Sequence, residues 1–156
     1  MFLKRQEFDK TEGYLKEAIA KSEDNEAKAE YYLKMAQLQL AKKQYQATKT
    51  NALEVLKLNP NNGTALMLIG KAYANSASNY GEDDFDHASV FWAAVDKFQK
   101  ARQVDHAMTE EADKLIGIYS QHFPSKDEAF FRSVTDGATV KIGSWINEST
   151  KARFRK

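Results

Sequence analysis

One spacing recurs three times along the chain and limits how it can fold. In each case an aromatic residue is followed by small or apolar residues three, seven and ten positions later, which places all four on one face of an α-helix. The three sets are Phe8, Thr11, Leu15 and Ala18; Tyr45, Thr48, Ala52 and Val55; and Phe91, Ala94, Phe98 and Ala101. A small residue lets a neighbouring helix approach, and the aromatic ring fills the wedge at the helix start. The spacing predicts three helices that pack alike.

We call these three sets the stripes, and a second pattern alternates with them along the chain. Its copies are Tyr32, Met35, Ala36 and Gln39; Leu66, Ile69, Gly70 and Tyr73; and, more loosely, Ala112, Leu115, Ile116 and Tyr119. Ala36 and Gly70 occupy the same slot, where two helices of a pair are expected to cross closely. The segment 29–62 contains both patterns without a gap. We expect a helix over about 26–42, a short turn, and a helix over about 45–58 that ends at the Asn-Pro-Asn-Asn-Gly run of 59–63, since proline cannot continue it.

These residues resemble the tetratricopeptide repeat, a helix pair of about 34 residues. The resemblance implies an all-α fold in which antiparallel helix pairs stack as a short right-handed solenoid, closed by a short extended or β-hairpin C-terminal segment. The expected parts are a helical domain over 1–134, with units at about 1–25, 29–62, 63–106 and 109–134, and a capping segment with a basic tail over 135–156. The departures from the family pattern are Gln39, Thr48, Ala52 and His106.

The first expected unit holds only the end of a first helix and a whole second helix. A repeat that opens in mid-unit leaves an apolar face without its partner helix, whereas stacked repeats carry a polar cap there. We therefore expect that the chain is the C-terminal part of a longer protein. The alternative is a short chain whose open end is covered by a second copy.

An insertion separates the two helices of the third unit. Residues 75–87 are rich in Ser, Asn, Gly and Asp, which indicates a loop or a slightly lengthened helix followed by a loop. The acidic residues and His87 do not have calcium-loop spacing, so a metal site is disfavoured. We expect a solvated acidic loop that caps a helix starting near Asp86; a partner-contacting loop is the alternative.

The helical periodicity fades after Val134. Residues 138–142 alternate and are β-branched, which predicts a strand, and Trp145-Ile146-Asn147 is expected to be a second strand or an extended stretch. We expect Trp145 and Ile146 to lie against the last helices and cover the end of the solenoid. The alternatives are a strand edge offered to a partner and a disordered tail.

This C-terminal part resembles the tails of tetratricopeptide-repeat proteins from Bacteroidetes-type bacteria, a group without an assigned activity. The shared features are Phe123-Pro124, Gly143-Ser144-Trp145-Ile146 and Ser149-Thr150. Many members of that group look exported. The resemblance therefore hints at the cell envelope or periplasm, with the cytoplasm as the alternative.

The composition excludes several classes of function. The net charge of the 156 residues is +1, so no field of one sign is present to attract nucleic acid. There is no cysteine, which excludes disulfides and zinc–thiolate sites. No apolar run reaches the roughly 20 residues of a transmembrane helix. The basic tail 151–156 is expected to be a solvated terminus or a weak anionic contact.

The sequence contains no pattern of catalytic chemistry. The three histidines, His87, His106 and His122, are far apart and lack a nearby nucleophile pattern. The glycines are scattered and form no phosphate cradle. Trp92 lies one residue off the aromatic stripe and is expected to be partly exposed, whereas the stripe itself is core. We predict no catalytic, cofactor-binding or metal-binding residues, and no enzyme activity.

The expected binding surface is the concave face, which the first helices of the pairs line. Its candidate residues are Glu30, Leu33, Lys34 and Gln37, with Ala41 beside them, from one helix and Thr64, Met67, Leu68, Lys71 and Asn75 from the next. With its two lysines, this surface suits a peptide with an acidic or amide group. Leu33 and Leu68 have an alternative role, which is packing against a neighbouring helix.

Two functions follow as hypotheses. The first is a scaffold or adaptor that binds a protein or peptide partner on the concave face, without nucleic acid. The second is a structural domain that self-assembles into a homo-oligomer through its open N-terminal repeat.

Overall fold

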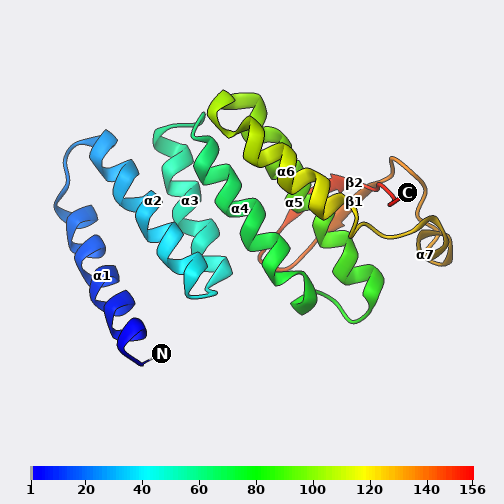
Figure 1. The fold of residues 1–156 in the computed structure, drawn as a ribbon, viewed down its shortest axis with the longest axis horizontal. Helices are drawn as coiled ribbons and strands as arrows, with labels where there is room; N and C mark the ends of the chain where they lie inside the picture. Colours follow the sequence, from blue (N-terminus) through cyan, green and yellow to red (C-terminus); the bar gives the residue numbers. More distant parts are fainter. Residues whose placement is uncertain (1) are drawn as a thin grey trace.

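The computed structural model describes residues 2–156, with side chains from Lys4 onward; the first expected unit counts from Met1, which lies outside the described residues. The described chain forms seven α-helices, two short 3-10 helices and one antiparallel pair of strands (Figure 1). The elements are α1 (Phe2–Lys21), α2 (Asn25–Ala41), α3 (Tyr45–Leu58), α4 (Gly63–Ser76), η1 (Ala77–Asn79), α5 (Asp84–Val104), η2 (His106–Met108), α6 (Thr109–Ser120), α7 (Lys126–Phe131), β1 (Thr139–Ile142) and β2 (Glu148–Lys151).

The helices follow one another as antiparallel neighbours, so the predicted all-α fold with a short hairpin is confirmed. The closest pairs are α2 with α3 and α4 with α5, and α3–α4 and α5–α6 contacts join them. Polar side chains mark the helix starts. Asp24 accepts a hydrogen bond from the Glu26 amide, and Asn62 accepts one from the Ala65 amide. No helix among residues 2–156 is both long enough and apolar enough to cross a bilayer.

The core is densest where α4 crosses α5. Gly70 lies directly under the ring of Phe98, and a Cβ atom at Gly70 would come within 2.5 Å of that ring. Phe98, Ala94 and Ala101 are fully buried. The small residue at the crossing therefore does what the repeated pattern predicts: it lets two helix backbones approach.

The C-terminal strands pack on α5. Glu148 pairs with Lys97 at 2.8 Å, and the Thr150 hydroxyl donates to the Asp96 carboxylate. The expected second strand at 145–147 is wrong, because these residues form the turn between β1 and β2, and Asn147 has a positive φ of 45°.

The turn of the hairpin reaches further back than the expected end-capping position. The Trp145 ring lies 5.6 Å from the ring of Tyr73 on α4. The Lys49 ammonium on α3 donates to the carbonyls of Trp145 and Ile146. The hairpin thus ties α5 to α3 and α4, and it covers the side of the helix row as well as the last helices.

Two further expectations need correction. Trp92 is buried, not partly exposed, because the C-terminal segment covers it and its Nε1 donates to the Arg153 carbonyl at 2.6 Å. The basic tail is not simply solvated. Arg153 pairs with Asp96 at 2.8 Å, and the Arg155 guanidinium donates to the Phe123 carbonyl at 2.9 Å.

The insertion folds as a lengthened helix followed by a loop. α4 continues to Ser76, η1 follows, and α5 begins at Asp84. The carboxylate of Asp83 accepts from the Asp86 amide at 2.9 Å and pairs with Arg132. The hydrogen bond from the Asp86 amide lowers the pKa of Asp83 most, and the interaction with Arg132 lowers it further. The acidic loop is therefore a helix cap, as expected.

Candidate partner-binding face

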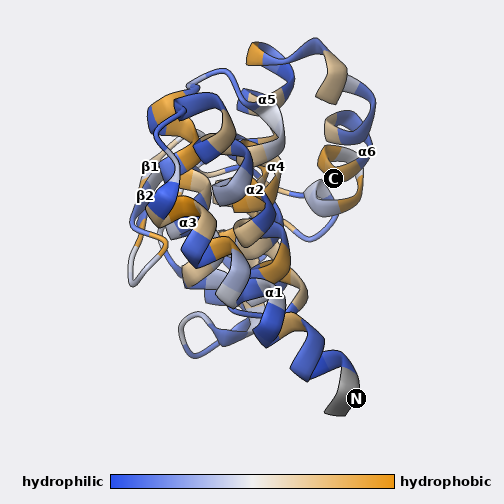
Figure 2. Ribbon diagram, turned by 90° about the vertical axis from the view of Figure 1, so that its left-hand side faces the viewer, coloured by the Kyte–Doolittle hydropathy of each residue, from blue (hydrophilic) through white to orange (hydrophobic). Residues whose placement is uncertain are grey.

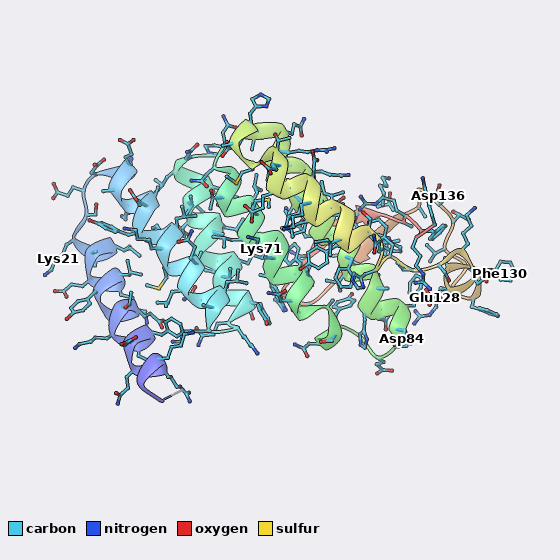
Figure 3. All side chains as sticks on the ribbon, in the orientation of Figure 1. Lys21, Lys71, Asp84, Glu128, Phe130 and Asp136 are labelled. Atoms are coloured by element: carbon cyan, nitrogen blue, oxygen red, sulfur yellow. The ribbon has the colours of Figure 1, made fainter. Side chains whose placement is uncertain are left out.

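The first helices of the pairs, α2, α4 and α6, share one side of the molecule, which we call the first-helix face. α2 contacts α4 directly, and Lys71 on α4 pairs with Glu111 on α6 at 2.7 Å. Figure 1 shows α4 and α6 in front of α5 and the strands, and Figure 3 shows Lys71 on this side. The first-helix face is where the sequence places the candidate residues.

The nine candidate residues divide into three groups by burial. Four are exposed, three are half-buried and two are buried. In that order they are Glu30, Lys34, Gln37 and Asn75; Leu33, Thr64 and Lys71; and Met67 and Leu68. The exposed and half-buried residues lie along α2, at the start of α4 and in its second half, so the face is most open over α2.

Met67 and Leu68 are corrected from surface to core. Their side chains are 1% and 5% exposed. The cause is the position of α4, which packs against α2, α3 and α5 at once and therefore buries most of its circumference. Leu68 therefore has the alternative role, which is packing against a neighbouring helix. Leu33 has this role in part, because it contacts the core while staying half-exposed.

The two lysines of the face differ in their surroundings. Lys71 is engaged by Glu111, so its charge is already balanced. Lys34 is exposed and forms no ion pair with any residue of the described chain. The expected attraction for an acidic partner therefore depends on one lysine.

A hollow of about 460 Å³ opens beside α2, and we call it the α2–α3 hollow. It brings together Glu30 and Leu33 from the candidate set with residues that the sequence reasoning missed. The complete lining is Asn25, Glu26, Ala29, Glu30, Leu33, Leu58, Asn59 and Asn62. One signal was available for part of it, because Glu26, Glu30 and Leu33 follow helical spacing on one face.

The three histidines considered for acid–base chemistry lie on separate elements. His87 lies near the start of α5 and His106 in η2. His122 follows α6, where its ring stacks 5.1 Å from that of Phe91. In the part of the chain that the structure describes, no group of three or more His, Cys, Asp or Glu side chains is arranged to hold a metal ion.

Two ionisable groups with shifted pKa values lie under the hairpin. Burial lowers the pKa of Lys49, and burial raises the pKa of the Tyr73 phenol far above its usual value. The Lys49 ammonium lies 5.2 Å from the centre of the Tyr73 ring, and the Tyr73 hydroxyl donates to the Ile146 carbonyl at 3.4 Å. These contacts hold the turn in place, which is a structural role.

Comparisons with models of known protein families, with curated proteins and with solved structures find no match to this chain.

Proposed function

We propose that the chain is a protein–protein interaction module of the tetratricopeptide type that binds a peptide or protein segment on its first-helix face. The observation that carries the proposal is the α2–α3 hollow. It combines accessible apolar groups, Leu33 and Leu58, with a polar rim, and it includes two residues of the predicted set.

The physical argument is one of preformed shape. Peptide grooves need apolar contacts in a concavity and polar groups around them, because the apolar contacts supply affinity and the polar groups supply orientation. α2 is held between α1 on one side and α3 and α4 on the other, so the wall of the hollow is already ordered. Binding of a partner there therefore costs little free energy for ordering the protein.

The test is a selection of random peptides from a display library on the immobilised chain. Enriched peptides are expected to slow amide hydrogen exchange in α2. Their affinity is expected to fall in Ala29→Trp, which fills the α2–α3 hollow. Ala47→Trp is the matched control, since Ala47 is a half-buried alanine in a shallow depression of α3.

Two results would contradict the module. One is the absence of any enriched peptide. The other is that the enriched peptides protect only segments outside α2, α4 and α6 and bind both tryptophan variants equally.

Self-assembly is the second candidate, and α1 supplies the observation that favours it. The side chain of Tyr14 is 64% exposed, and the stripe residue Thr11 is exposed too. A second copy would cover this face. Sedimentation velocity over a wide concentration range would show a dimer that Tyr14→Ser weakens, whereas a strict monomer at the highest concentration counts against it.

A further inference from the structure

The chemistry of the α2–α3 hollow narrows the class of partner. Its floor is apolar. Leu58, the last residue of α3, is 37% exposed, and it lies with Ala29 and Leu33 in the lining. Leu33 also contacts the core, so the floor is continuous with the folded body of the protein. A volume of about 460 Å³ is in the range of small ligand pockets and admits an apolar side chain with its neighbour in a peptide.

The charge of the hollow is negative. Glu26 and Glu30 are one helical turn apart on α2, both are exposed, and both line the hollow. Neither forms an ion pair with another described residue. Like charges at this spacing repel one another and destabilise a helix. A cation placed between the two carboxylates would relieve that repulsion and gain attraction from both.

The rim adds amide donors. Asn59 and Asn62 use their side-chain oxygens within their own turn, since Asn59 accepts from the Asn61 amide and Asn62 from the Ala65 amide. Their NH2 groups donate no hydrogen bond to another described residue. Side-chain NH2 groups at a rim suit the backbone carbonyls of an extended peptide.

The lysines of the first-helix face do not alter this charge. Lys71 is paired with Glu111, and Lys34 is not among the residues that line the hollow. The negative charge of the hollow would therefore repel the acidic group that the sequence alone suggested for the partner.

We propose that the α2–α3 hollow binds a peptide segment in which a lysine or arginine stands next to a large apolar residue. The apolar side chain lies on Leu33 and Leu58, and the cation bridges Glu26 and Glu30. This inference rests on the proposed function and adds to it the chemical class of the partner.

The experiment uses the whole chain, labelled for amide NMR, and two pools of capped nonapeptides. Each peptide of the first pool carries two Lys or Arg and two Leu or Phe residues; the second pool has Glu in place of the cations. We expect the basic pool to shift the amides of 25–33 and 58–62. We expect Glu26→Gln with Glu30→Gln to weaken this binding on the order of 5-fold, the scale of two partly solvated ion pairs.

The control for total charge is Glu82→Gln with Glu110→Gln. It removes two exposed glutamates that lie outside the α2–α3 hollow and should leave the binding of the basic pool unchanged. Because all four side chains are exposed, both double variants are expected to keep the fold, and the unperturbed amides of α4 and α5 report on it in the same spectra.

The outcomes separate the inference from the proposed function. Equal shifts from the acidic pool, or unchanged affinity in the Glu26 and Glu30 variant, would overturn the inference. Shifts from either pool that fall elsewhere on the first-helix face would also overturn it, while the proposed function stands. If neither pool shifts any amide, the inference fails, and the display selection alone decides the proposed function.

Discussion

α1 and α5 carry the same spacing of residues, yet the two helices differ in how deeply that spacing is buried. In α5, the stripe residues Ala94, Phe98 and Ala101 are fully buried. In α1, Thr11 is exposed, and the other stripe positions, including Phe8, are only half-buried. Figure 2 shows hydrophilic colouring along much of α1.

The difference arises from the neighbours of each helix. α5 packs against α4, α6 and the C-terminal strands, whereas α1 packs chiefly against α2. Ion pairs supplement the packing of α1, where the Lys42 ammonium lies 2.8 Å from carboxylate oxygens of both Asp9 and Glu12. A repeated spacing thus defines which face of a helix packs, but the surrounding elements decide how much that face contributes to stability.

The largest expected effect is the loss of the central aromatic residue of α5. Phe98→Ala should lower the free energy of unfolding by about 3–5 kcal/mol, because it removes a fully buried ring and leaves a cavity. Phe8→Ala in α1 is the matched variant and should cost less than about 1.5 kcal/mol, since its ring is half-buried. Urea unfolding of both variants measures the contrast. Equal losses would mean that α1 is as integral to the core as α5.

Glycine substitutions should change sign between the two regions. Gly70→Ala should destabilise by about 1–3 kcal/mol, because the new methyl group collides with the Phe98 ring. Gly13→Ala in α1 has no heavy atom within 4 Å of the added Cβ, so it should stabilise by up to about 1 kcal/mol through helix propensity alone. Thermal and urea unfolding provide the test. A stabilising Gly70→Ala would show that the helix crossing is looser than described.

The hairpin provides cover that α1 lacks, and Lys49 holds its turn. Lys49→Met should destabilise by about 1–2 kcal/mol, because the carbonyls of Trp145 and Ile146 lose a charged donor. Lys57→Met, at an exposed position of the same helix, should leave the free energy of unfolding almost unchanged. Amide exchange in 139–151 should speed up in the first variant only. If it does not, other contacts position the hairpin.

Local patterns in the sequence were enough to predict the helix pairs. The expected helices over about 26–42 and 45–58 match α2 and α3 closely. Such predictions succeed because helical spacing, proline and capping residues act within a few positions of one another. The same local signals also predicted that the stripe of the second unit, which lies on α3, packs into the core.

Contacts between distant segments were not predictable in this way. Lys49 meets the turn at Trp145, and Lys71 meets Glu111, because packing brings together helices that no local spacing relates. The candidate site shows the same limit. Glu30 and Leu33 were found from helical spacing, whereas Leu58 joined them only through the antiparallel packing of α2 and α3.

The smallest expected effect concerns pH and the attachment of α1. Hydrogen bonds from Lys42 lower the pKa of Glu12 and of Asp9. Because these folded-state pKa values lie below the ordinary ones, the stabilisation is complete above the ordinary carboxyl pKa and is lost as the pH falls through the lowered values. Amide exchange, corrected for its intrinsic pH dependence, should therefore show α1 losing protection before α4 and α5 do as the pH falls below the ordinary carboxyl pKa. In Lys42→Met this pH dependence should disappear, with only a small cost in stability because the carboxylates are partly solvated. Simultaneous loss of protection in all three helices would instead mean that α1 and the buried pair unfold as one cooperative unit.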